Sequence, residues 1–161
     1  MPTILETVGI DLGTTNSLIV RREGSGQFQV ITNDEGERIT PSVVMFSPDK
    51  VVVGTSALRA AVGKTERVCR EIKRHMGEDF SFQTPEGDEY TPAEVSAQIL
   101  KKLKISVEEK FDCDVKKAVI SVPARFGAEA KEATEIAGEI AGYKEISLIH
   151  QPTTAVFSEY Y

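Results

Sequence analysis

Short apolar runs separated by turn residues fill the first third of the chain. Alternation of apolar and polar residues over about four to eight positions is typical of half-buried strands, and clusters of Gly, Pro, Asn and Asp mark turns. The pattern predicts strands at residues 6–12, 18–22, 27–31, 42–47 and 51–53. Two helices are expected next, at about residues 55–62 and 65–75, the second ending near Gly77.

A long helix is predicted after the polar segment 78–91, in which no clear element is expected. Thr91 is placed to cap this helix, with Pro92 at its first position and Glu94 three residues on to close a capping box. Apolar residues then recur at every fourth position from Val95 to Phe111. A helix of ~20 residues with one buried face follows from this spacing.

The last third of the chain alternates between strand and helix. The pattern predicts a strand at residues 118–122, a helix at 128–141 and a second strand at 146–150. Two strands joined by one helix form a parallel crossover. A further short helix is predicted to open at Gln151 and Pro152.

Composition adds limits to this α/β pattern. A chain of 161 residues, 40% hydrophobic and 27% charged, has enough apolar mass for one core. Its formal net charge of −6 argues against binding to nucleic acid or to an anionic membrane. Cys69 and Cys113 are isolated, no signal peptide is apparent, and no apolar run approaches the ~20 residues of a membrane span. We therefore expect a cytoplasmic location.

Asp11 is the candidate functional residue that the pattern itself singles out, because it interrupts an alternating apolar stretch. A carboxylate is costly to bury unless it meets a cation or hydrogen-bond donors. The residues after it supply a tight turn and donors: Gly13, Thr14, Thr15 and Asn16. Such a loop can cradle phosphates, and Asp11 can hold Mg²⁺ through water, since that ion usually keeps several waters. The alternative is an ordinary hairpin whose aspartate caps the turn.

Other nucleotide and metal signatures are absent from the sequence. Neither G-x-x-x-x-G-K-[ST] nor G-x-G-x-x-G occurs, so no P-loop or Rossmann fingerprint competes for the phosphate role. His75 and His150 lie far apart without the spacing of zinc ligands.

Several ordered motifs resemble one family over nearly the whole chain. These are GIDLGTTNS, DEGERITPSVVMF, VVVGTSALRAAV, EIKRHMG, TPAEVSAQILKKLK, AVISVPARF and IAGY. In this order they resemble the start of a heat shock protein 70 (DnaK-type) chaperone. The resemblance implies an α/β fold, namely an actin-like ATPase (ribonuclease H-like) lobe. Its expected architecture is a mixed five-stranded sheet with flanking helices and a small, reduced peripheral subdomain.

The resemblance also implies a domain assignment and a set of site residues. Residues 1–161 would be the first lobe of the nucleotide-binding domain, a fragment without the second lobe or the peptide-binding domain. Asp11 would help to hold a hydrated Mg²⁺, and the loop of Gly13, Thr14, Thr15 and Asn16 would bind the phosphates of ATP or ADP. Lys73 would contact the terminal phosphate or the attacking water, a role that suits phosphoryl transfer. Read without the resemblance, Lys73 lies in a charged run typical of a solvated surface.

Pro123 and Gln151 are the implied switch residues, and both have altered surroundings. Pro123 matches a proline that relays the nucleotide state in this family, although a strand terminator is the plain interpretation. Arg125 replaces an expected tyrosine nearby. Gln151 stands where the family usually places a glutamate, so a carboxylate is lost beside the metal and the switch. Nucleotide binding is expected to survive this change better than hydrolysis.

Partners and alternatives complete the expectations. By resemblance, unfolded client polypeptides would bind through the missing domain, and a J-domain co-chaperone and a nucleotide exchange factor would act on the whole protein. We expect weak nucleotide binding and no ATP hydrolysis from this chain alone, because one phosphate hairpin leaves most of the ligand in water. An actin-like filament protein, a sugar kinase and a catalytically degenerate nucleotide-binding relative are the alternatives.

Overall fold

A mixed sheet forms the centre of the molecule. The computed structural model describes residues 5–151. Five strands follow the order β11-β10-β1-β2-β3, and a short sixth strand, β4, pairs with the start of β2. The strands are β1 (Leu5–Leu12), β2 (Asn16–Arg22), β3 (Phe28–Val30), β4 (Thr40–Pro41), β10 (Asp114–Val122) and β11 (Glu145–His150). The strands β1, β10 and β11 are parallel, whereas β2 is antiparallel to both β1 and β3.

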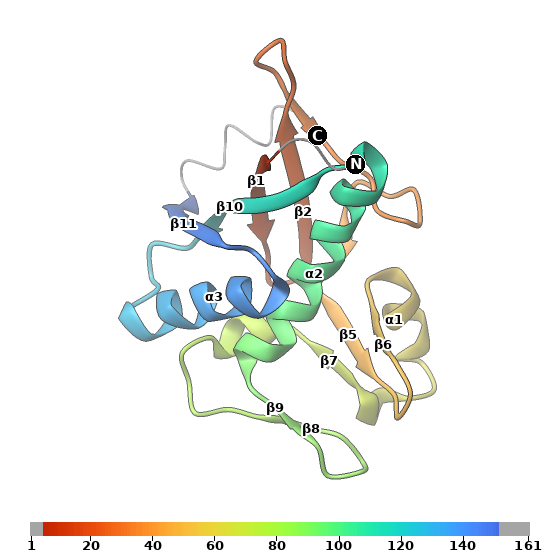
Figure 1. Cartoon of the computed structure of the whole chain (residues 1–161). Helices are drawn as coiled ribbons and strands as arrows, with labels where there is room; N and C mark the ends of the chain where they lie inside the picture. Colours follow the sequence, from red (N-terminus) through yellow and green to blue (C-terminus); the bar gives the residue numbers. More distant parts are fainter. Residues whose placement is uncertain (1–4, 152–161) are drawn as a thin grey trace.

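Two helices, α2 (Pro92–Phe111) and α3 (Ala128–Ala141), pack against this sheet (Figure 1). The predicted capping box of α2 is confirmed: Thr91 Oγ1 accepts from the Glu94 N–H at 3.1 Å, and Glu94 Oε1 accepts from the Thr91 N–H at 2.9 Å. The core joins side chains of β1, β10 and both helices, among them Ile10, Leu103 and Ala137. These helices therefore bury the sheet face that carries the even-numbered residues of β1.

A smaller unit lies at the N-terminal end of α2, which is the lower end of this helix in Figure 1. It contains the sheet β6-β5-β7, the helix α1 and the hairpin β8-β9. Phe46 stacks on Tyr90 with ring centroids 4.0 Å apart, which attaches the hairpin to this sheet. The unit matches the expected reduced peripheral subdomain. Its elements are β5 (Val43–Phe46), β6 (Val51–Val53), α1 (Thr55–Ala60), β7 (Val68–Arg70), β8 (Phe82–Gln83) and β9 (Glu89–Tyr90).

The helix predicted at residues 65–75 is wrong. The segment holds a 3-10 turn (Thr65–Arg67), the strand β7 and a second 3-10 turn, η2 (Ile72–His75). Val44 of β5 pairs with Cys69, so the backbone of β7 gains ladder hydrogen bonds while the Cys69 side chain is buried. Glu71, in the left-handed region at φ 55°, separates this strand from η2. Tertiary pairing here overrides a helical spacing of apolar residues.

The other predictions of elements are largely confirmed. The helix at 128–141 agrees with α3 residue for residue, and the two strands around it form the predicted parallel crossover. The strand predicted at 118–122 is longer, because β10 starts at Asp114. Three two-residue strands, β4, β8 and β9, were not predicted. The helix expected from Gln151 and Pro152 onward lies outside the described residues.

Gly77, just after η2, packs very closely against the backbone at the start of α3. Its φ is 82°, and a Cβ added there would lie 2.6 Å from the backbone nitrogen of Ala130. Both the conformation and the space therefore require glycine. The backbone that follows Lys73 is in this way packed directly on α3.

We expect Gly77→Ala to lower the free energy of unfolding by about 2–4 kcal/mol, because it adds overpacking against backbone to an unfavourable φ. Urea denaturation would measure the loss. Gly24→Ala is the matched control, since a Cβ there meets nothing within 4 Å. Equal stability of the two variants would contradict the close contact.

Candidate functional site

The loop at residues 13–16 joins β1 to β2 in a hairpin that pairs Leu12 with Ser17. A Cβ on Gly13 would overlap the carbonyl oxygen of Asn16, so only glycine allows the loop to close this tightly. Thr15 and Asn16 are exposed at its tip. The predicted loop residues are therefore contiguous and accessible.

Ser42 holds the loop in place, a role for which the sequence carried no signal. Its N–H donates to the carbonyl of Thr15 at 2.8 Å, and its Oγ donates to the carbonyl of Gly13 at 2.8 Å. A further 2.8 Å hydrogen bond joins the hydroxyls of Ser17 and Ser42. Two loop carbonyls are thus engaged, while the N–H groups of Thr14 and Thr15 have no acceptor among the residues described. Free N–H groups in a bend are the donors that an anion requires.

A cavity of about 390 Å³ opens beside this loop. Its lining includes Arg70, at the end of β7, and the adjacent Glu71, so a cation and a carboxylate both border the space beside the loop. The lining residues are Thr14, Thr15, Asn16, Pro41, Ser42, Val43, Leu58, Arg70 and Glu71. A larger cavity of about 850 Å³ lies between α2, β6 and residues 32–35, and it includes none of the predicted site residues.

Asp11 lies on the sheet face opposite the two helices, in register with Ser121 of β10. Ser121 Oγ donates a 3.1 Å hydrogen bond to Asp11 Oδ1. That is the one hydrogen bond to this carboxylate found within residues 5–151, so most of its lone pairs stay available. Ser121 is buried, and it fixes the orientation of Asp11.

Lys73 is buried and only 6% of its surface is exposed, although its charged neighbours in sequence suggest a surface position. Burial lowers the pKa of Lys73 below its ordinary value; the Asp11 carboxylate opposes that shift, and the Arg125 guanidinium adds to it. The Nζ atom lies 6.0 Å from the centroid of the Phe126 ring. Lys73 and Asp11, 62 positions apart in a chain of 161, therefore act on each other electrostatically.

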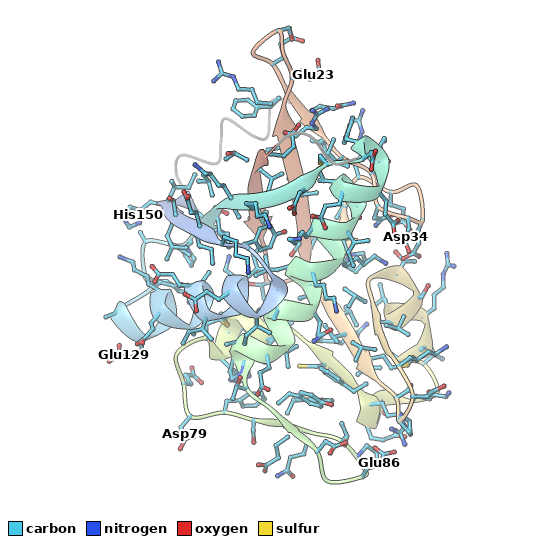
Figure 2. The ribbon with its side chains drawn as sticks, in the orientation of Figure 1. Glu23, Asp34, Asp79, Glu86, Glu129 and His150 are labelled. Carbon is cyan, nitrogen blue, oxygen red and sulfur yellow. The ribbon has the colours of Figure 1, made fainter. Side chains whose placement is uncertain are left out.

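Pro123 and Gln151 follow two paired strand ends. Val122 pairs with His150 across the parallel strands β10 and β11, so the next residues of both strands emerge at the same sheet edge as Asp11. The turn after β10 and the end of β11 lie on one side of the molecule, where Figure 2 labels His150 and Glu129. Pro123 is buried and Gln151 is half-buried.

The donor set at this edge fits a hydrated magnesium ion. Asp11 offers one carboxylate, and the described residues contain no group of three or more His, Cys, Asp or Glu side chains placed to hold an ion. Mg²⁺ commonly binds through one or two carboxylates, water and substrate phosphates. Asp11 would be its protein partner, and the bound ion would neutralise phosphate charge.

The hairpin β1-β2, the parallel crossover β10-α3-β11 and the flanking helices define the actin-like ATPase class of α/β folds. The family model described as "Hsp70 protein" matches residues 7–159, and the chain belongs to this family.

Named relatives agree with the family. The chain is 46% identical over 148 residues to chaperone protein DnaK of Halobacterium salinarum, which is 92% of this chain and 23% of the relative. It is 46% identical over 152 residues to the DnaK chaperones of Thermosipho africanus and Thermotoga neapolitana, or 94% of this chain and 25% of each relative. The chain thus spans about a quarter of the length of the curated relatives it matches. Within residues 5–151, no helix is long and apolar enough to cross a membrane.

We expect Lys73→Met to stabilise the fold at about pH 7 by on the order of 1 kcal/mol, because it removes a buried charge that no direct ion pair within residues 5–151 compensates. The lowered pKa means that the unfolded chain holds this proton more tightly. Stability from this group therefore rises with pH between the lowered folded value and the ordinary ~10.4.

Urea titrations at several pH values would test both parts of this prediction. The stability gained by Lys73→Met relative to wild type should shrink as the pH rises through this range, because wild type alone carries the lysine. The exposed Lys64→Met is the control and should leave both the stability and its pH dependence nearly unchanged. A Lys73→Met variant less stable than wild type would count against the burial penalty.

Proposed function

We propose that the chain is the first lobe of a heat shock protein 70-type nucleotide-binding domain and binds the phosphates of ATP or ADP with Mg²⁺. The observation that carries the proposal is the loop at residues 13–16: Ser42 binds the carbonyls of Gly13 and Thr15, while the N–H groups of Thr14 and Thr15 have no acceptor within residues 5–151. The electrostatic interaction between Asp11 and the buried Lys73 supports the proposal, with Asp11 as the metal partner and Lys73 as the cation of such a ligand. Preorganised donors and charges are what phosphoryl transfer requires.

In this proposal Asp11 holds the hydrated ion, Lys73 contacts the terminal phosphate or the attacking water, and Gly13, Thr14, Thr15 and Asn16 bind the phosphates. Pro123 and Gln151 form the switch that responds to the nucleotide. Hydrolysis takes place when the complete nucleotide domain is present, and this lobe alone binds weakly, since one hairpin covers little of the ligand.

The wider function is proposed from the family. ATP binding and hydrolysis would drive cycles of client binding through a peptide-binding domain, assisted by a J-domain co-chaperone and a nucleotide exchange factor. A cytoplasmic location is part of the same proposal. The uncharged Gln151, just after β11, is the reason to test the catalytically degenerate relative as well.

We expect calorimetric titration with Mg-ATP to show binding that Asp11→Asn weakens by roughly tenfold, because an amide cannot supply the charge that attracts the hydrated ion. Asp79→Asn is the matched control, since Asp79 is exposed and lies below α3 in Figure 2, whereas His150 lies above that helix. Undetectable binding, or equal loss in both variants, would refute a working phosphate site in this lobe.

Gln151→Glu tests the degenerate candidate without relying on turnover. A carboxylate beside the ion attracts Mg²⁺ and repels uncomplexed triphosphate, so the ratio of ATP affinities with and without Mg²⁺ should rise by roughly fivefold. Titrations in excess Mg²⁺ and in a chelator give this ratio, with Gln98→Glu on α2 as the control. An unchanged ratio would remove Gln151 from the nucleotide site.

A further inference from the structure

The turn after β10 presents Arg125 at the sheet edge that carries Asp11. The Phe126 N–H donates to the Pro123 carbonyl at 3.0 Å, which closes the turn. Pro123 and Phe126 are buried at its two ends, while Ala124 and Arg125 are exposed between them. Buried ends on a hydrogen-bonded turn fix the position from which the Arg125 side chain extends.

The cationic side chains of Arg125 and Lys73 both lie near the aromatic ring of Phe126. The Arg125 Cζ lies 5.4 Å from the centroid of Phe126, and the Lys73 Nζ lies 6.0 Å from the same centroid. Neither forms an ion pair with a carboxylate within residues 5–151. Among the described residues, Asp11 is the one acidic side chain that acts on Lys73, so these three side chains carry a net charge of about +1 in a chain of net charge −6.

Lys73 is desolvated and has Arg125 as a second cation near it, and the Asp11 carboxylate offsets only part of the resulting cost. Two like charges close together repel each other, and Lys73 has already lost most of its water. An anion between them would replace repulsion with two charge-assisted contacts. An arginine is well suited to phosphate because its planar guanidinium donates two parallel hydrogen bonds.

We propose that Arg125 is an anion-contacting residue of the phosphate site, and that together with Lys73 it binds the terminal phosphate of a polyphosphate ligand. The inference rests on the proposed function and deepens it, because it gives the site a second cation on the switch turn. Occupation of the site would then pull on the turn that begins at Pro123. The plain alternative is an exposed arginine that rests on Phe126 and contacts only solvent.

Inorganic tripolyphosphate, titrated calorimetrically without Mg²⁺ at low salt, tests this role apart from the ion and the nucleoside. We expect Arg125→Ala to weaken its binding by roughly tenfold, and Arg125→Lys to lose less because it keeps the charge. Arg59→Ala, at an exposed position on α1, is the control and should bind like wild type. The NMR signal of the Arg125 Nε–H should shift during the titration.

Each outcome is decisive for the inference. Equal affinities of wild type and Arg125→Ala, or no binding of tripolyphosphate to wild type, would overturn it. If Mg-ATP binds and depends on Asp11 while Arg125→Ala has no effect, the proposed function stands and the inference fails. If tripolyphosphate binding needs Arg125 but Mg-ATP does not bind, the inference stands and the proposed function fails.

Discussion

The parallel pairing of β1, β10 and β11 is the constraint on which the candidate site depends. Parallel strands end at the same edge of a sheet, and the observed register places Asp11 beside Ser121 and Val122 beside His150. Residues more than a hundred positions apart in the chain, such as Asp11 and Ser121, are brought together by the backbone hydrogen bonds between β1 and β10. The helices α2 and α3 secure this register because a slip of one residue would turn the apolar side chains of β1 away from them.

Two features of the segment at residues 71–73 are energetically unfavourable and depend on the stability of the rest of the fold. Lys73 is a buried cation, and Glu71 just before it adopts a left-handed conformation that costs a non-glycine residue about 1–2 kcal/mol. Both features occur within three residues, on a segment secured by β7 on one side and by α3 on the other. Such concentrations of strain and buried charge are common at functional sites, where they improve the position of a catalytic or binding group.

Local patterns in the sequence predicted most of the fold and, of the candidate site, Asp11 and the loop at residues 13–16. Asp11 was identifiable from chemistry, because a lone carboxylate in an apolar strand demands a partner. Lys73 was not, since a charged run looks the same whether it is solvated or folded inward, and only the ordered family motifs indicated it. Ser42 had no signal at all, because its partners are loop carbonyls that come into reach through the pairing of β2 with β4. The failed helix at 65–75 has a similar cause: β5 competes for that backbone from a distance.

The close packing of Gly77 on Ala130 has a mechanical consequence. Only four positions separate Lys73 from Gly77, and α3 begins just after the turn that holds Pro123. A displacement of the Lys73 backbone cannot be absorbed by loose chain between these points. It must either rotate the backbone at Glu71, which already lies outside the common conformations, or carry the first turn of α3 along with it. A shift at the buried lysine would therefore either strain Glu71 further or move the start of α3.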